Sequence, residues 1–194
     1  MHLKEIEKLF DKSPILDFKS IERIVQDNKK SKKSSYAKLL VSNLIKKGKI
    51  NRIGKGVYSK YSESSLAVFA FKPAYLGLQS ALSFYGIWEQ ETIPIILTTK
   101  KVRRGVRSIL DSNILIRKID KKYFFGFNFI KEGSFYLPYS DLEKTFIDMV
   151  VFNQKMSLEV IKEIKKKIDK KRLNQYIQRY SPQLQKQIRG WQDI

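Results

Sequence analysis

The chain has 194 residues, 42% of them hydrophobic and 12% aromatic, which is enough for one domain or two small ones with their own cores. Its 39 Lys and Arg against 19 Asp and Glu give a formal net charge of +20, and this balance indicates a polyanionic partner, nucleic acid before an anionic membrane surface. The absence of Cys excludes disulfides and thiolate metal sites, and a single histidine, His2, argues against His-based catalysis.

The N-terminal segment begins with two predicted helices. Apolar residues recur at helical spacing in HLKEIEKLF, residues 2–10, and Ser13-Pro14 interrupts that pattern. A second amphipathic pattern runs from Phe18 to Gln26, and Asp17 stands where an N-cap residue is expected. Each helix has one apolar face that a small domain would bury.

The third predicted helix, within YAKLLVSNLIKK, is the candidate for contacting a partner. We expect Ser34 or Ser35 to cap its N-terminus and Gly48 to end it. A helical wheel separates a buried arc from an outward arc of small polar and cationic side chains. The predicted buried arc is Tyr36, Ala37, Leu40 and Leu44, and the outward arc is Ser35, Lys38, Ser42 and Lys46.

A hairpin is predicted directly after this helix. Two short β-rich runs, residues 49–53 and 57–60, flank Gly54-Lys55-Gly56, whose glycines permit the positive φ angles of a tight turn. Lys55 would lie at the tip. This order of three helices and a hairpin, with leucines four apart followed by a glycine-flanked turn and Gly-Val-Tyr, resembles the winged helix-turn-helix of prokaryotic transcriptional regulators.

Positive charge is concentrated in the same segment. Eleven cations occur from Lys29 through Lys60, and no carboxylate lies between Asp27 and Glu63 in the sequence. A solvated face normally mixes both signs, so this segregation favours a polyanion over the alternatives of an AT-biased genome or adaptation to heat or salt. The residues predicted to contact DNA are Lys32, Lys33, Ser34, Ser35, Lys38, Ser42, Lys46, Arg52 and Lys55.

The outward face of the third helix has no Arg or Gln, so bidentate reading of guanine or adenine by those side chains is not expected there. Specificity would come from Lys38, Asn43 or the shape of the DNA. A winged helix that contacts protein instead of DNA is the alternative interpretation of this segment.

A second domain is expected after Ser62 and extends to residue 152. Residues 75–87 are predicted to form a helix, and IPIILTT a short buried strand. A cationic turn, KKVRRGVRS, leads to three further β-rich runs, NILIRKI, YFFGFNFI and SFYLPY, and then to a helix in SDLEKTFIDMVVF. Strands interspersed with helices predict an α+β (mixed α/β) fold with a sheet of about four strands.

Three groups of charged residues in this domain are candidate sites. Arg103, Arg104 and Arg107 could bind phosphate or an acidic partner, and a solvated loop is the alternative. We interpret Glu89 and Glu91 as part of a polar loop. Metal ligation by Asp141, Glu143 and Asp148 is disfavoured, because capping by Asp141 and pairing of Lys144 explain these charges. No P-loop or other catalytic signature is present, so we expect no enzyme activity, cofactor or metal.

The C-terminal segment, residues 153–194, is strongly basic and helical in pattern. One helix is predicted from Ser157 to Tyr180, with Leu158, Ile161, Ile164 and Ile168 on its apolar stripe. A final helix would dock through Leu184, Ile188 and Trp191. The stripe could pack on the second domain or form a homodimer contact, the lysines could extend a DNA-binding surface, and a membrane-surface helix is the third choice.

Two motifs that follow the predicted winged helix in the sequence resemble motifs of the AbiEi family of antitoxins and related transcriptional regulators of type IV toxin-antitoxin systems. They are Ala81-Leu82-Ser83 with Gly86, and Glu143-Lys144-Thr145-Phe146-Ile147-Asp148, in which Phe146 and Ile147 replace the usual leucines. The resemblance covers roughly residues 1–152. It implies an N-terminal domain that represses the protein's own promoter and a second domain that counteracts a nucleotidyltransferase toxin, without requiring a stable complex.

We therefore expect a DNA-binding repressor whose partner is double-stranded operator DNA. No apolar run approaches the ~18–20 residues of a membrane span, and MHLKEIEKLF lacks a signal-peptide pattern, so the expected location is the cytoplasm. The alternatives are an RNA-binding or protein-interaction module and, more remotely, a carboxylate-dependent nuclease.

Overall fold

The computed structural model describes residues 2–27 and 34–192, which form two compact units. Unit one comprises residues 1–71 with 108–112, and unit two comprises residues 72–107 with 113–194. The sequence placed the boundary after Ser62. The following segment, η1 (Ser64–Phe71), instead contacts β2 (Asn51–Gly54) within unit one, which places the division after Phe71.

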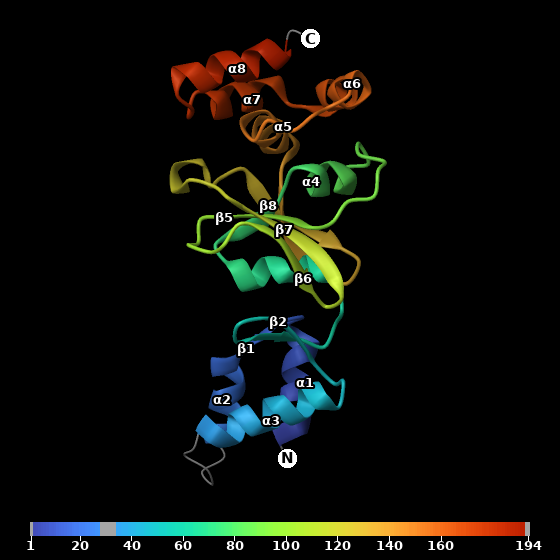
Figure 1. Cartoon of the computed structure of the whole chain (residues 1–194), viewed down its shortest axis with the longest axis vertical. Coiled ribbons are helices and arrows are strands. Elements are labelled where there is room, and N and C mark those ends of the chain that lie inside the picture. Colours follow the sequence, from blue (N-terminus) through green and yellow to red (C-terminus); the bar gives the residue numbers. More distant parts are fainter. Residues whose placement is uncertain (1, 28–33, 193–194) are drawn as a thin grey trace. The chain divides into compact units, whose positions relative to one another are not determined.

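Unit one contains three helices and a small sheet, followed by η1 (Figure 1). The elements are α1 (His2–Lys12), β1 (Leu16–Asp17), α2 (Phe18–Asp27), α3 (Ser34–Lys46), β2 and β3 (Val57–Ser59). The strand order is β1-β3-β2, with both pairs antiparallel. The core formed by the helices and the sheet consists of Ile6, Phe10, Leu16, Ile21, Val41, Leu44, Ile50 and Tyr58.

Both predicted helices that precede α3 are present, and the predicted cap of the second is confirmed. The Asp17 side chain accepts a hydrogen bond from the Ser20 backbone N–H at 2.7 Å, and this bond lowers the pKa of Asp17. Asp17 also pairs with Val57 across the sheet. One residue therefore fixes both the start of α2 and the position of β3.

Unit two contains a six-stranded mixed sheet. Its strands are β4 (Ala74–Leu76), β5 (Ile95–Thr98), β6 (Gly105–Ile109), β7 (Ser112–Lys118), β8 (Phe127–Glu132) and β9 (Phe135–Ser140), in the order β6-β7-β5-β4-β9-β8. The β5–β7 and β4–β9 pairs are parallel, whereas β4–β5 and β8–β9 are antiparallel. The expected α+β fold is confirmed.

The sheet is larger than the expected four strands, because two segments that the sequence assigned otherwise are strands. The predicted helix over residues 75–87 is shorter, α4 (Gln79–Phe84), and its first two residues belong to β4 instead. The second half of the predicted cationic turn, KKVRRGVRS, forms most of the edge strand β6. Three-residue β4 is buried on every position, so no polar alternation marks it in the sequence.

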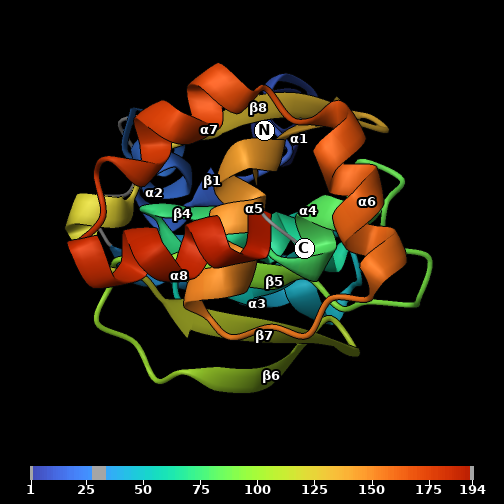
Figure 2. The same cartoon turned by 90° about the horizontal axis from the view of Figure 1, so that it is seen from above.

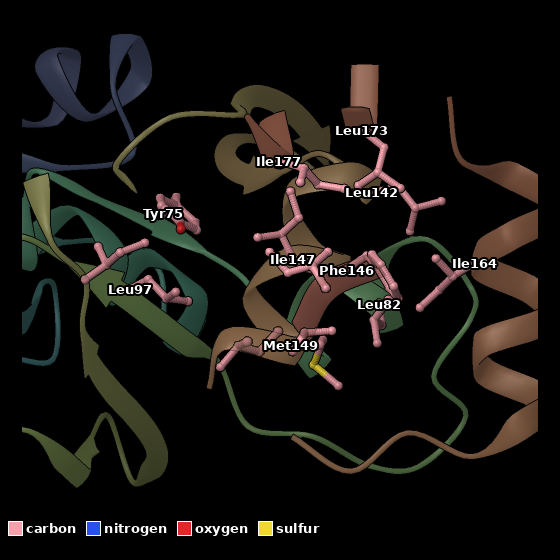
Figure 3. Packing of buried hydrophobic residues seen from close by; sticks show 14 of the residues in the cluster. Tyr75, Leu82, Leu97, Leu142, Phe146, Ile147, Met149, Ile164, Leu173 and Ile177 are labelled. Atoms are coloured by element: carbon pink, nitrogen blue, oxygen red, sulfur yellow. The ribbon is translucent and has the colours of Figure 1, made fainter. Parts of the chain in front are cut away.

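Helix α5 (Leu142–Val151) lies at the centre of the helical layer of unit two. It contacts α4, α6 (Leu158–Lys167), α7 (Lys170–Ile177) and α8 (Pro182–Gln192), and Figure 2 shows the last three surrounding it. Its residues Phe146, Ile147 and Met149 pack between the sheet and these helices (Figure 3). A short 3₁₀ helix, η2 (Lys121–Tyr123), connects β7 to β8.

The prediction of a single helix from Ser157 to Tyr180 is wrong, because the chain forms two helices there, α6 and α7. Asp169 separates them, because its carboxylate accepts from the backbone N–H groups of Lys171 (2.9 Å) and Arg172 (3.1 Å) and so caps a new helix. Leu158, expected on the buried stripe, is 62% exposed. The predicted docking of the last helix is confirmed by Ile188, which is fully buried in the core.

Within residues 2–27 and 34–192, no helix combines the length and apolar composition that crossing a bilayer requires.

Candidate nucleic-acid interface

Helix α3 presents the predicted polar face to solvent. Ser35, Lys38, Ser42 and Lys46 are all exposed, and their spacing places them on one side of the helix. The buried side agrees with the prediction at Ala37 and Leu44, but its third member is Val41. Tyr36 is 41% exposed and Leu40 is half-buried, because the apolar stripe lies one residue further along than the leucine repeat suggested.

The predicted end of α3 at Gly48 agrees with the structure, whereas the predicted N-terminal cap does not. The helix already includes Ser34 and Ser35, so neither occupies the cap position before it. Residues 28–33, with the predicted contacts Lys32 and Lys33, lie outside the described residues, as does the side chain of Ser34. Gly48 ends the helix as expected, with φ of 64°, and Lys49 donates its backbone N–H to the Leu44 carbonyl at 2.9 Å.

The predicted hairpin is present and short. A two-residue turn, Lys55-Gly56, joins β2 to β3, and Gly56 has a φ of 71° that favours glycine. Both cations of the hairpin are exposed: Lys55 lies in the turn, and the Arg52 Nε donates to the Gly54 carbonyl at 3.4 Å. The Phe18 backbone N–H donates to the Gly56 carbonyl at 2.8 Å, which fastens the turn to the start of α2.

Gly54 allows a close contact between strand β2 of the hairpin and η1. A Cβ atom at this position would lie 2.4 Å from the Cβ of Ala70, well inside the normal contact distance. The absence of a side chain therefore lets η1 pack directly against β2.

Two of the cations counted in the sequence form ion pairs with α1. Lys49 lies 3.3 Å from Glu7 and Lys60 lies 2.9 Å from Asp11, and the hydrogen bond that Lys60 donates to the Asp11 carboxylate raises the pKa of Lys60. Within the described residues, Lys38, Lys46, Arg52 and Lys55 have no ion pair. Their charge therefore remains available to an anionic partner.

Sequence reasoning missed the apolar residues on the exposed side of α3. Leu39 is 57% exposed and Ile45 is 37% exposed. The signal was present, because Ala37, Val41 and Leu44 already supply an apolar i, i+4, i+7 stripe that leaves Leu39 on the opposite side.

The second predicted anion site is a surface recess on β6. Arg103, Arg104 and Arg107 line it together with Gly105 and Val106, around a volume of about 590 Å³. The Arg107 Nη2 donates to the Arg103 carbonyl at 2.6 Å, which holds the loop before β6 in place.

A group of polar residues is enclosed in the core of unit two. Lys144 and Asp148, one turn apart on α5, have 0% and 1% of their side chains exposed and form an ion pair. The Lys144 ammonium also donates to the Tyr180 hydroxyl at 3.1 Å, and the Tyr75 hydroxyl donates to the second Asp148 oxygen at 2.7 Å. The sequence predicted the capping by Asp141, which accepts from the Lys144 backbone at 2.8 Å, but not the burial of these charges.

Burial controls the pKa values in this cluster. It lowers the pKa of Lys144 and raises that of Asp148, although the attraction between the two charges acts in the opposite direction for each. Burial, followed by the neighbouring Asp148 charge, raises the pKa of Tyr75 well above its usual range. Since Lys144 and Asp148 are enclosed and satisfy each other, we interpret the cluster as part of the core.

The other candidate carboxylates have structural contacts. Glu143 accepts from the Asp169 backbone N–H at 2.7 Å and lies 3.6 Å from Arg172. Among residues 2–27 and 34–192, no group of three or more His, Asp or Glu side chains has the arrangement of a metal site.

No protein-family model matches the sequence, and no curated protein shows significant sequence similarity to it. Among solved structures, the chain is similar to the crystal structure of the RV2827C protein from Mycobacterium tuberculosis. The TM-score is 0.60, with 10% sequence identity, and the match covers 94% of this chain and 72% of that one. At this identity the likeness shows a shared fold alone.

Proposed function

We propose that unit one is a winged helix-turn-helix that binds double-stranded DNA, and that the protein is a transcriptional repressor of the AbiEi antitoxin type. The order of α1, β1, α2, α3, β2 and β3 supports this proposal. The observation that carries it is the exposed face of α3, on which Ser35, Lys38, Ser42 and Lys46 have no carboxylate partner among residues 2–27 and 34–192.

In this proposal α3 enters the major groove and the hairpin contacts the backbone beside it. The hydroxyls of Ser35 and Ser42 and the ammonium of Lys38 would meet phosphates and base edges. Arg52 and Lys55 on the exposed hairpin would neutralise adjacent phosphates and release counterions. Base contacts would thus come from α3, and phosphate contacts from both α3 and the hairpin.

Fluorescence anisotropy with promoter DNA tests the proposal. We expect tighter binding to the protein's own promoter than to a scrambled duplex of equal length, at several salt concentrations. Lys55→Ala should weaken both complexes to the same extent and reduce the salt slope by about one. Lys121→Ala, at an exposed lysine of unit two, is the matched control and should change neither. Equal binding to both duplexes that disappears as salt rises would refute operator recognition.

The antitoxin part of the proposal rests on the two sequence motifs in unit two and requires a separate test. Co-expression with a nucleotidyltransferase encoded next to this gene should restore growth that the nucleotidyltransferase alone inhibits. A variant with Lys38→Ala and Lys55→Ala should still restore growth, because unit two would carry this activity. Failure to restore growth would leave a repressor without antitoxin action.

A protein-interaction module is the second candidate function, and the exposure of Leu39 and Tyr36 on α3 favours it. It predicts a stable complex with a protein partner that Leu39→Ala weakens while DNA binding stays unchanged. Preference for structured RNA over duplex DNA at matched salt would instead indicate an RNA-binding module.

A further inference from the structure

A pocket of about 490 Å³ lies among helices α5, α6, α7 and α8 of unit two. Its floor is apolar and belongs to the core: Phe146 is 2% exposed, Ile164 is 1% exposed and Leu173 is 2% exposed. Pockets that hold small molecules typically have volumes of roughly 300–1,000 Å³ and a mainly apolar lining with a few polar groups. The size and the floor of this pocket match that description.

The rim of the pocket is cationic. Lys165 from α6, Lys170 from α7 and Arg189 from α8 line it, together with Asn174 and the half-buried Ile168. The Arg189 Nη1 donates to the Asn174 side-chain oxygen at 3.4 Å, which directs the guanidinium across the gap between α7 and α8. Three positive charges from three helices therefore surround one apolar floor.

Within residues 2–27 and 34–192, no carboxylate lines this pocket or forms an ion pair with Lys165, Lys170 or Arg189. Glu163 lies 2.6 Å from Lys166, Asp169 caps α7, and Glu143 holds the Asp169 backbone and Arg172. None of these three acidic residues lines the pocket. The charge of Lys165, Lys170 and Arg189 is thus left to a group from outside.

We propose that this pocket binds a small organic anion. The acidic group of the ligand lies among Lys165, Lys170 and Arg189, and its apolar or aromatic part packs on the floor formed by Phe146, Ile164 and Leu173. Duplex DNA would use the rim but not the floor, because its phosphodiester backbone has no apolar body that could pack on Phe146, Ile164 and Leu173. The proposal is independent of DNA binding by unit one.

A pair of fluorescent probes that differ in one charge tests the proposal. 8-Anilinonaphthalene-1-sulfonate has an aromatic body and a sulfonate, and N-phenyl-1-naphthylamine has the same body without the charge. We expect the sulfonate probe to bind the intact protein, and Lys165→Met to weaken it at least tenfold while the neutral probe is affected less than twofold. Lys166→Met, one residue away and outside the pocket lining, is the matched control and should leave both unchanged.

A second variant keeps the test decisive. Asn174→Trp, at an exposed position on the pocket wall, should block both probes, while circular dichroism shows the helices intact. Equal losses for Lys165→Met and Lys166→Met would overturn the proposal, since they would indicate general attraction to a basic surface. Displacement of the sulfonate probe by a short DNA or RNA strand, with the same dependence on Lys165, would also overturn it and assign the rim to nucleic acid.

Discussion

Lys144 is the residue whose environment departs most from the usual one for its type. Lysine is almost never fully buried unless it is paired, and here its ammonium has both Asp148 and the Tyr180 hydroxyl as partners. The ring of Phe125 lies 5.3 Å from the ammonium, which adds a cation–π contact. Gly126 leaves room for the lysine stem, because a Cβ there would lie 2.9 Å from the Lys144 Cβ.

Removing the lysine charge should destabilise unit two strongly. Lys144→Met leaves the Asp148 carboxylate buried with the Tyr75 hydroxyl as its remaining partner, and breaking a buried pair in this way costs about 3–5 kcal/mol. The double variant Lys144→Met, Asp148→Leu should recover most of that loss, because it leaves no buried charge. Urea denaturation measures both, with Lys166→Met as the control. A single variant within ~0.5 kcal/mol of the native protein, the range of ordinary surface substitutions, would contradict the burial of this pair.

Leu39 allows a test of base contacts by α3. If α3 lies in the major groove, this exposed leucine can contact the C5-methyl group of a thymine. Leu39→Ala should then weaken operator binding by about 1–2 kcal/mol without changing the salt slope, since no charge is lost. Replacing the contacted thymine by deoxyuridine should have no further effect on the variant. Leu158→Ala, at an equally exposed leucine in unit two, is the control.

At the scale of elements, the start of α2 has the clearest consequence. Asp17→Ala removes the acceptor of the Ser20 N–H, and loss of such a cap costs about 1 kcal/mol. Asp17→Asn keeps an acceptor and should be close to the native protein at pH 7. Thermal denaturation of the two variants measures the difference, and identical melting temperatures would contradict a capping role.

The pH dependence of the same residue follows from its lowered pKa. The folded protein binds this proton less tightly than the unfolded chain, so the stabilisation is present above the unfolded value of about 3.8 and is lost as pH falls through the lower folded value. Asp17→Asn cannot titrate and should show a smaller loss of stability between pH 5 and pH 3. If the variant lost as much stability as the native protein over this pH range, the loss would come from other carboxylates.

Most elements could be predicted from the sequence, including the enclosed strand β5 and helix α5, but the short buried strand β4 and the contacts inside the core could not. The hairpin around Lys55 and the helices of unit one follow from local spacing and glycine positions. Helix α5 is buried on nearly every side, whereas capping by Asp141 and pairing of Lys144 are all that the sequence predicts for its charges. Their partners Tyr75 and Tyr180 lie far away along the chain, and no local pattern reveals such contacts.

The candidate interface shows the same limit on a smaller scale. Ser35, Lys38, Ser42 and Lys46 were placed on the exposed side of α3 from spacing alone, and they are exposed. Tyr36 was placed on the wrong side, because two apolar stripes, one starting at Tyr36 and one at Ala37, fit the helical period. Only packing against residues such as Ile21 and Tyr58 selects the second.

Across the whole molecule, tyrosine burial should determine the response to alkali. Burial raises the pKa of Tyr85 and Tyr176 to about 12, with a further contribution from Asp141 at Tyr176, and raises those of Tyr75, Tyr139 and Tyr180 as well. These are five of the ten tyrosines, so about half of the tyrosinate absorbance at 295 nm should appear late in a titration of the native protein.

The sign of the accompanying stability change is fixed by the direction of these shifts. The folded state holds the phenolic protons more tightly, so stability is complete below the unfolded pKa of about 10 and falls as pH rises through about 12. Urea denaturation at pH 9 and pH 11.5 should show the fall, and Tyr176→Phe should reduce it. If the tyrosine titration of the native protein coincided with that of the protein in denaturing urea, the raised tyrosine pKa values would be disproved.

The enclosure of Lys144 also gives the protein an internal chemical reporter. An amine-reactive acylating reagent needs an accessible, unprotonated amine, and the Lys144 amine has no exposed surface in the folded state. Mass spectrometry of protein acylated under native conditions should therefore find this lysine unmodified while surface lysines carry the label. The rate of its modification would then report the rate at which the helical layer around α5 opens, so this native lysine would measure local unfolding of unit two without an engineered label.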